Sequence, residues 1–491
     1  MSKLRITALL LAMLSVASVF ASCAGENQGG SSNAAETKAD AAVTTASPET
    51  TDIVYAAELP GDINYTGRDF TMMVYNESNS TWYDVDFNAT EENGEPINDA
   101  VFRRTAKTEE KLGINIERAP VENYGMAPLK KSVQAGEHAY DAGFVYTHGA
   151  VQLAEDKFLY NLNSISDLQL DQPWWDQNAV EDLSIDNKLF MVTGDISIMY
   201  KKSLRVVYYN KALAANYTLD NPYQLMDEHT WTLEAMTNMS KAVSEDLDGD
   251  GDRDENDRYG FVYSIDSIAL GLIASGVEFA SKDADDLPYI DFYNERTQQI
   301  WEDYIALFYN KEVADNCTAT GHNGGTMFLN DQALFCCVEL HNIERFREMA
   351  NDFGILPMPL YEASQEEYYC TINPHCAAML VIPADNEDVT YTAHVLDTLG
   401  AESKNQLTPA YYEKYLKGKS ARDNESEASL DIIFSSIRYD LGYAYNWGTL
   451  GDLPLTLVRA YKEDFASQYN KLLSKAEKAL SKTIDHYADM D

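Results

Sequence analysis

The sequence is short of positive charge. It has 37 lysine and arginine residues against 79 aspartate and glutamate residues, so the 491-residue chain has a formal net charge of −42. Proteins that bind nucleic acid neutralise phosphates with clustered lysine and arginine. The composition therefore argues against a nucleic-acid partner, and against polyanionic ligands unless one local pocket is basic. A neutral or cationic ligand suits the chain better.

Long apolar runs are scarce too. One prominent run, ITALLLAMLSVASVF, has 15 residues and follows the basic start MSKLR. This is short for a membrane-spanning helix and has the length of a signal-peptide core. It leads into FASC, which resembles a bacterial lipobox with Phe20 in place of the usual Leu or Val. We expect residues 1–23 to be a lipoprotein signal peptide ending at a lipidated Cys23, with ordinary signal cleavage near Cys23 as the alternative.

Residues 24–52 are small and polar and contain no aromatic residue. Such a segment buries too little apolar surface to fold, so it behaves as a flexible tether. A tether directly after a lipidated cysteine would hold a folded domain off a membrane. We therefore expect the mature protein on the extracytoplasmic face of the cell membrane, held there by its lipid.

Cysteine is sparse and irregularly placed. Beyond Cys23 there are five cysteines with no C-x-x-C pair, and the eight histidines show no metal-ligand spacing, so zinc is not expected. Export permits disulfides. A Cys370–Cys376 disulfide and buried free thiols both remain open.

Catalytic motifs are missing as well. The sequence contains no G-x-S-x-G, H-E-x-x-H or P-loop, and GHNGGT at 321–326 has no phosphate-binding lysine. We therefore expect a protein that is not an enzyme. A secreted glycoside hydrolase is one alternative, because 79 acidic residues always offer some pair of carboxylates. A calcium-dependent surface adhesion or scaffold protein is another.

From about Ile53 onward, strand patterns alternate with helical patterns, which predicts an α/β fold with a mostly parallel sheet. The 96–113 pattern is amphipathic and ends at Gly113, a typical C-cap. Expected strands cover 69–76, 114–119, 140–147, 203–209, 258–264, 333–340, 352–360 and 376–383, and expected helices cover 96–113, 127–135, 231–243, 297–310 and the end from about 455.

One acidic stretch stands out. DLDGDGDRDEND, residues 246–257, places seven acidic side chains in twelve residues. The spacing is that of a calcium loop, in which alternate carboxylates point inward and a glycine, here Gly251, permits the sharp turn. A solvated acidic turn is the alternative. We expect Ca²⁺ to be bound by Asp246, Asp248, Asp250, Asp252 and Asp257, the last in place of the usual Glu.

The surroundings of this loop suggest its role. A regulatory EF-hand has a helix on both sides, whereas here a predicted helix leads in and the predicted strand RYGFVYS leads out. Only one such loop is present. We therefore expect a structural calcium that fixes a helix-to-strand connection, not a sensor.

The order of these features resembles the carbohydrate-type (family 1-like) solute-binding lipoproteins of bacterial ABC importers, in particular those of Gram-positive cell surfaces. The resemblance is carried by the lipobox-like Cys23 and its tether, the calcium loop followed by YGF, and the segments FLYNLNSI, RVVYYNKAL, FGILPMP and AAMLVIP. These pieces span nearly all of the chain after Ile53.

The resemblance implies an α/β, two-lobed periplasmic-binding-protein-like fold with the ligand cleft between the lobes. The lobes would close on ligand by a hinge motion and deliver it to ABC permease subunits. Crossings between lobes are expected near Leu204, Thr371 and residue 420. The N-terminal lobe would then comprise 53–204 plus 372–420, and the C-terminal lobe 205–371 plus 421–491.

Ligand contacts are expected just after strands, where cleft ligands meet the connecting loops. Sugars bind through aromatic faces and through polar groups that match their hydroxyls. For YAYNWG, the expectation comes from the resemblance, which places a stacking aromatic there. Candidate ligand-binding residues are Tyr146, His148, Trp174, Trp175, Asp195, Tyr263, Asp266, Glu339, His341, Tyr445 and Trp447.

The sequence thus predicts a monomeric, lipid-anchored protein that captures a carbohydrate, an oligosaccharide above all. It leaves open the sugar, its length and linkage, and the permease. A peptide or another solute stays an alternative ligand, because this fold serves many ligands.

Overall fold

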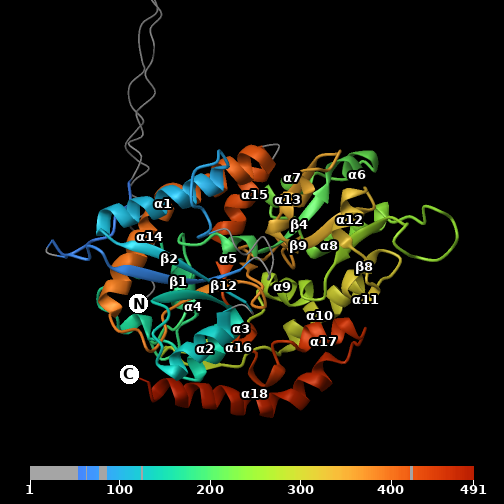
Figure 1. Cartoon of the computed structure of the whole chain (residues 1–491). Coiled ribbons are helices and arrows are strands. Elements are labelled where there is room, and N and C mark those ends of the chain that lie inside the picture. The colour runs from blue at the N-terminus through green and yellow to red at the C-terminus, as the bar shows by residue number, and fades with distance from the viewer. Residues whose placement is uncertain (1–53, 62, 77–85, 123–124, 421–423, 491) are drawn as a thin grey trace, which may run out of the picture. The chain divides into compact units, whose positions relative to one another are not determined.

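The computed structural model describes residues 54–61, 63–76, 86–122, 125–420 and 424–490, so Cys23 and the tether lie outside it. The described part of the chain forms two lobes. In each lobe, helices pack around one main β-sheet (Figure 1). No helix in the described ranges has both the length and the apolar character needed to cross a bilayer.

The first sheet has the strand order β12-β3-β1-β2, with β1 parallel to β2 and β3 and with β12 antiparallel to β3. Its core is apolar because most residues of β1, β3 and β12 are buried, as Phe70 and Met72 are, whereas the edge strand β2 has no fully buried residue. Helix α1 packs on α14, and Gly113 caps α1 with a φ of 71°, as its sequence predicts. The elements of this lobe are β1 (Asp69–Tyr75), α1 (Pro96–Leu112), β2 (Asn115–Val121), α2 (Met126–Ala135), β3 (Ala142–Tyr146), α3 (Thr147–Glu155), η2 (Leu162–Ser164), α4 (Gln177–Asp182), α5 (Met199–Lys202), β12 (Ala378–Val381), α14 (Val389–Pro409) and the π-helix η4 (Ala410–Ser420).

The second sheet has the order β10-β4-β9-β5-β8 and is mixed. Strands β5, β8 and β9 are parallel, while β4 is antiparallel to both of its neighbours. Its elements are β4 (Arg205–Asn210), α6 (Lys211–Asn216), α7 (Pro222–Asp227), α8 (Leu233–Val243), β5 (Tyr259–Tyr263), α9 (Ser267–Ala274), the hairpin β6 (Ser281–Lys282) and β7 (Pro288–Tyr289), α10 (Glu295–Phe308), β8 (Ala314–Asn316), α11 (Cys317–Thr320), α12 (Gly324–Leu329), β9 (Ala333–Glu339), η3 (Leu340–Asn342), α13 (Ile343–Phe346) and β10 (Phe353–Leu356).

The chain leaves the first sheet before β4 and returns to it before β12. At this passage Leu204 and Ile372 form an isolated antiparallel bridge. Beside it, β11 (Cys370–Thr371) pairs in parallel with β13 (Ile437–Arg438). Strands β4 and β12 each come directly after the chain has crossed from one sheet to the other. Each is antiparallel to the strands with which it pairs. The expected mostly parallel arrangement therefore holds for the first sheet except at β12, and the second sheet departs from it at β4 alone, because β10 runs in the same direction as β9, β5 and β8. The lobe boundaries given above stay a prediction.

The last helices of the chain pack against elements of both lobes. Helix α18 contacts both α3 and α10, and Figure 1 shows it running along the lower side of the view. The five cysteines after Cys23 are free, which answers the open question on Cys370 and Cys376. These last elements are α15 (Asn424–Ser435), α16 (Leu441–Tyr445), η5 (Trp447–Thr449), α17 (Leu453–Arg459) and α18 (Phe465–Ala488).

Candidate functional site

A cavity of about 480 Å³ opens at the edge of the second sheet where β5, β8 and β9 end. We call it the strand-end pocket. Parallel strands end at the same edge, so the residues that follow them are brought together there, as is usual for ligand sites in α/β folds. Its polar lining includes Ser264, Asp266, His322, Asn323, Glu339, His341, Asn342 and Arg345.

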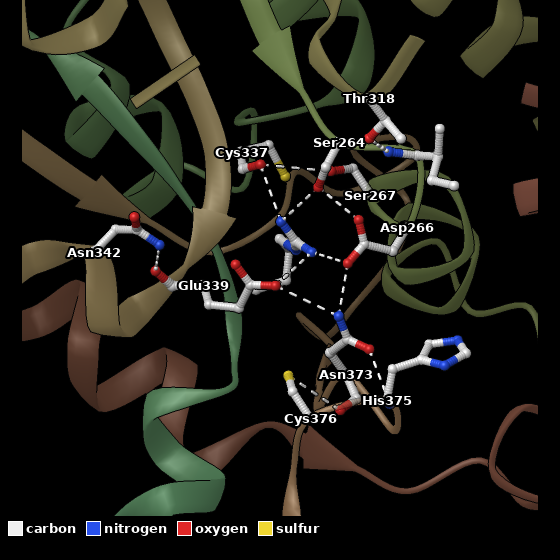
Figure 2. Close-up of polar contacts among 12 residues, drawn as sticks. Ser264, Asp266, Ser267, Thr318, Cys337, Glu339, Asn342, Asn373, His375 and Cys376 are labelled. Carbon is white, nitrogen blue, oxygen red and sulfur yellow. Dashed lines mark hydrogen bonds and ion pairs between the residues drawn. The ribbon is translucent and has the colours of Figure 1, made fainter. Parts of the chain in front are cut away.

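Arg205 is the centre of the polar contacts at this edge, and its partners Ser264, Asp266 and Glu339 are labelled in Figure 2. It is the first residue of β4, and because β4 is antiparallel to β9 it pairs in register with Glu339, the last residue of β9. Its side chain is only 1% exposed. Nη2 of Arg205 contacts the carboxylate of Asp266 and lies 2.9 Å from Glu339 Oε1, and Nη1 donates to Ser264 Oγ at 3.1 Å.

Asn373 brings the returning chain into the same cluster. Its Nδ2 donates to Asp266 Oδ2 at 2.6 Å and reaches Glu339 Oε1 at 3.4 Å. Asn373 lies between the Leu204–Ile372 bridge and β12, on the segment that enters the first sheet. The cluster therefore joins the second sheet to the passage between the lobes (Figure 2).

The electrostatics of the cluster are unbalanced toward negative charge, since one guanidinium faces two carboxylates. Burial lowers the pKa of Arg205, but Asp266 and Glu339 raise it by more, so the pKa stays above its ordinary value. Burial, followed by the charge of Lys202, lowers the pKa of His341 to about 4, so its imidazole is neutral at pH 7. Such a site offers fixed acceptors and a neutral ring, which suits hydroxyl groups and disfavours anions.

Two further groups lie near this cluster. The buried hydroxyl of Tyr443 has no hydrogen-bond partner among the described residues. Burial and then the charge of Asp266 raise the pKa of that phenol. His148 Nδ1 lies 2.7 Å from the Ala444 carbonyl, and its ring is 4.4 Å from that of His375. Burial, with His375 next, lowers the pKa of His148 to about 4.

The structure brings four of the sequence-predicted ligand residues together. Tyr263, Asp266, Glu339 and His341 all line the strand-end pocket. Tyr146 ends β3 at the corresponding edge of the first sheet, and His148 begins α3 beside it. Contact of any of these six residues with a ligand stays a prediction.

The other predicted residues are placed elsewhere, with their polar groups already engaged. Trp174 and Trp175 are buried, and both indole N–H groups donate to Asp397 Oδ1, at 3.0 and 2.9 Å. Asp195 is buried between Lys201 Nζ at 3.1 Å and Lys404 Nζ at 2.9 Å.

The aromatic pair of the YAYNWG segment is also packed inside. Tyr445 and Trp447 stack with ring centroids 5.0 Å apart. The hydroxyl of Tyr445 bonds to that of Tyr487, and Trp447 Nε1 donates to Thr483 Oγ1 at 2.9 Å. Both partners belong to α18, so this pair joins the core and does not reach the strand-end pocket.

Arg205, Ser264 and Asn373 were not among the sequence-predicted site residues. A charged residue at the start of the apolar segment RVVYYN is the only local sign of Arg205. Its partners Asp266 and Glu339 lie 61 and 134 residues away, so only the sheet reveals the cluster.

A second cavity, of about 720 Å³, lies against β13 and is called the β13 cavity. It adjoins the carboxyl-terminal end of α9, whereas the strand-end pocket adjoins the start of that helix. Asp182 accepts the Tyr439 N–H at 2.9 Å, and Asp440 accepts the Phe279 and Tyr443 N–H groups at 2.7 and 2.8 Å. No sequence-predicted ligand residue is among its lining residues.

The acidic loop connects α8 to β5, so the predicted helix-to-strand connection is confirmed. Carboxylate oxygens of Asp246, Asp248 and Asp250 all lie within 4.8 Å of one another. The hydrogen bond from Asp250 N–H lowers the pKa of Asp248, but desolvation and the neighbouring carboxylates raise it by more. Such a group of hard oxygen donors fits a calcium ion.

The remaining two predicted ligands differ in placement. Asp257 is buried, and its carboxylate accepts the N–H groups of Leu247 and Asp254 at 2.9 and 3.0 Å, which closes the loop on itself. Asp252 donates its N–H to Asp250 Oδ1 at 2.8 Å. Calcium binding at the loop stays a prediction.

No protein-family model and no curated protein matches the chain. Solved structures match it in fold. The sugar-binding protein MalE of Xanthomonas citri superposes with a TM-score of 0.57 at 12% identity, over 87% of this chain and 100% of MalE. The ABC substrate-binding protein Lmo0181 of Listeria monocytogenes, in complex with cycloalternan, gives 0.52 at 14% identity over 86% and 97%. UgpB of Mycobacterium tuberculosis, in complex with glycerophosphocholine, gives 0.51 at 12% over 78% and 95%.

These similarities show the fold. The chain has the α/β, two-lobed periplasmic-binding-protein-like fold of sugar-binding proteins such as MalE. The matched proteins are binding proteins and not enzymes.

Proposed function

We propose that this chain is the extracytoplasmic solute-binding protein of an ABC importer and that it captures a carbohydrate, foremost an oligosaccharide. The observation that carries the proposal is the strand-end pocket, in which Asp266 and Glu339 are held in fixed orientations by the buried Arg205 and by Asn373. Preorganised acceptors of this kind match sugar hydroxyls, because they cost little ordering when the ligand arrives. The fold of the matched sugar-binding proteins supports the same reading.

Capture would involve both lobes. The polar cluster includes Asn373 of the returning segment, and Tyr146 and His148 lie at the edge of the first sheet. A ligand in the strand-end pocket that also met this edge would draw the lobes together by a hinge motion. The closed form would then deliver its cargo to the permease, whose ATPase subunit supplies the energy.

The glycoside hydrolase alternative is less well supported. Asp266 and Glu339, the two carboxylates of the pocket, contact the same guanidinium nitrogen of Arg205. Hydrolysis needs one carboxylic acid free to protonate the leaving group and a second carboxylate across the bond. A shared ion pair serves binding better than proton transfer.

The anchor and the calcium are part of the proposal. Lipidation at Cys23 followed by the polar tether would keep the folded part at the membrane surface as a monomer. The carboxylates of Asp246, Asp248 and Asp250 would hold one Ca²⁺ with a structural role, together with Asp252 and Asp257.

A thermal-shift screen of the chain from Ile53 onward against a glycan panel tests the capture step. A ligand at 100 times its dissociation constant stabilises the folded state by about 2.7 kcal/mol, a shift that is readily measured. We expect one glycan class to raise the melting temperature with no product formed. Turnover of a glycan would instead make the chain a hydrolase, and no shift with any glycan would point to a peptide or other solute.

A further inference from the structure

The second half of the acidic loop is tied to the segments that lead into β5, β8 and β9, the strands whose far ends form the strand-end pocket. Nη2 of Arg253 donates to the carbonyl groups of Arg258 at 2.7 Å and Glu312 at 3.1 Å. Nε2 of Gln332, just before β9, donates to the Glu255 carbonyl at 2.7 Å. This half of the loop is therefore fixed to the strands whose ends form the pocket, and not only to itself.

Glu255 extends this connection into the pocket wall. Its Oε2 lies 3.1 Å from Nε2 of His322, and His322 lines the strand-end pocket. The other ring nitrogen of His322, Nδ1, lies 3.3 Å from Asp315 Oδ2. The imidazole is thus held from both sides, between the acidic loop and the end of β8.

Asp315 continues the contacts to the polar cluster. The buried Oδ2 atom also accepts from Cys317 Sγ and Thr320 Oγ1, both at 3.3 Å, so it fixes α11. Within α11, Thr318 Oγ1 accepts the N–H of Ile265 at 3.2 Å, directly before Asp266 (Figure 2). These polar contacts, together with the backbone of α11 and the Ile265–Asp266 peptide, therefore connect Glu255 to the carboxylate that binds Arg205.

We propose that Glu255 is a positioning residue through which the acidic loop orders the 315–325 wall of the strand-end pocket. The loop then influences ligand affinity as well as stability, beyond the structural role proposed above. The part that concerns ligand rests on the proposed carbohydrate capture, whereas the ordering of the wall does not. Contiguity alone does not establish coupling, so the test measures the coupling directly.

The exposures of the two partners separate this role from simple stabilisation. The Glu255 side chain is 66% exposed and that of His322 is 15% exposed. An exposed ion pair contributes little to global stability. Losing the Glu255 carboxylate should therefore leave the melting temperature nearly unchanged while it loosens the wall that His322 belongs to.

The experiment compares Glu255→Gln with Glu362→Gln in the full chain. Glu362 forms a similarly exposed pair with Arg296, at 2.9 Å, and does not line the pocket. Hydrogen exchange of amides 315–325 is measured first, without ligand. We expect faster exchange in Glu255→Gln and none of this effect in Glu362→Gln. Equal exchange in both variants and the unmodified chain overturns the proposal.

Affinity and calcium provide two further readouts. With the glycan found in the thermal-shift screen, Glu255→Gln should bind about two- to fivefold more weakly at an unchanged melting temperature. An unchanged affinity overturns the link to ligand. Calcium alone should slow exchange at 315–325 in the unmodified chain and less so in Glu255→Gln. If exchange responds and no glycan binds, the ordering role stands and the proposed carbohydrate function fails.

Discussion

Carboxylates line the strand-end pocket and the β13 cavity alike, but their partners differ. In the strand-end pocket, Asp266 and Glu339 face the buried guanidinium of Arg205. In the β13 cavity, Asp182 and Asp440 are held by backbone N–H groups. Burial raises the pKa of Asp182 to about 6 and that of Asp440 to about 7.

The difference shows how one buried cation decides the character of a cavity. A carboxylate that loses water needs an opposite charge or a proton. Arg205 supplies the charge at the strand ends, where its guanidinium contacts both carboxylates. The β13 cavity has carboxyl groups that take up protons near neutral pH instead. The acceptors around Arg205 are the better basis for recognising hydroxyl groups, because the guanidinium holds them in place.

Removing the cation should have the largest effect. Arg205→Met leaves the carboxylates of Asp266 and Glu339, which are 16% and 19% exposed, without their partner, and breaking a largely buried pair in this way costs up to about 3–5 kcal/mol. Urea unfolding measures the loss. Arg438→Met is the matched control, because Arg438 lies at the β13 cavity but is 41% exposed, stacks over Tyr369 at 3.6 Å and pairs with the exposed Glu367 at 3.9 Å. It should cost about 1 kcal/mol or less.

The same comparison can be sharpened by removing the acids as well. Adding Asp266→Asn and Glu339→Gln to Arg205→Met leaves no unpaired carboxylate, so part of the stability should return. A triple variant no more stable than Arg205→Met would mean that packing around the guanidinium, and not its charge, holds this edge together.

A change of pH should have the next largest effect, through Asp440. Its pKa rises from 3.8 when unfolded to about 7 when folded, so the folded state binds the proton more tightly. This contribution to stability is full below about pH 4 and is lost as the pH rises through 7, by roughly 4 kcal/mol. Asp440→Asn should remove this part of the pH dependence, measured by urea unfolding at each pH.

The exposed residue Asp220 offers the control for this experiment. Asp220→Asn should leave the pH profile as it is. A profile that is equally steep with Asp440→Asn would assign the dependence to other carboxyl groups, such as Asp182 or Asp397, whose pKa values burial also raises to about 6.

The acidic loop extends the comparison to the clustered carboxylates of Asp246, Asp248 and Asp250, and here the expected effect is smallest. Calcium at 100 times its dissociation constant should stabilise the chain by about 2.7 kcal/mol. Asp246→Asn with Asp250→Asn should abolish the shift, because two of the three clustered carboxylates lose their charge. A calcium-independent melting temperature in the unmodified chain would contradict a bound cation.

Most of the architecture could be predicted from local sequence. Apolar runs identified β1, β3, β9 and β12, and Gly113 identified the end of α1, because burial and backbone geometry constrain each residue locally. The strand ends then placed Asp266 and Glu339 at the pocket.

The rest of the site depends on contacts far apart in the chain. Trp174 and Trp175 are of the residue type that stacks on sugars. However, Asp397, more than 200 residues away, accepts hydrogen bonds from both indole N–H groups. Tyr445 and Trp447 likewise form hydrogen bonds with residues of α18, which lie 42 and 36 positions later in the chain. Residue type alone does not distinguish an aromatic side chain that awaits a ligand from one that already has a partner.

Helix α18 also has a consequence for the order in which the chain can mature. Phe465 at its start stacks on Trp301 with centroids 5.0 Å apart, and Tyr487 near its end lies 5.0 Å from Phe190. Neither aromatic cluster is complete until the last described helix has been synthesised. For a chain that is exported as proposed, both aromatic clusters can therefore form only when translocation is nearly finished. A product that stops before Phe465 leaves Trp301 and its neighbours uncovered, and such surfaces aggregate.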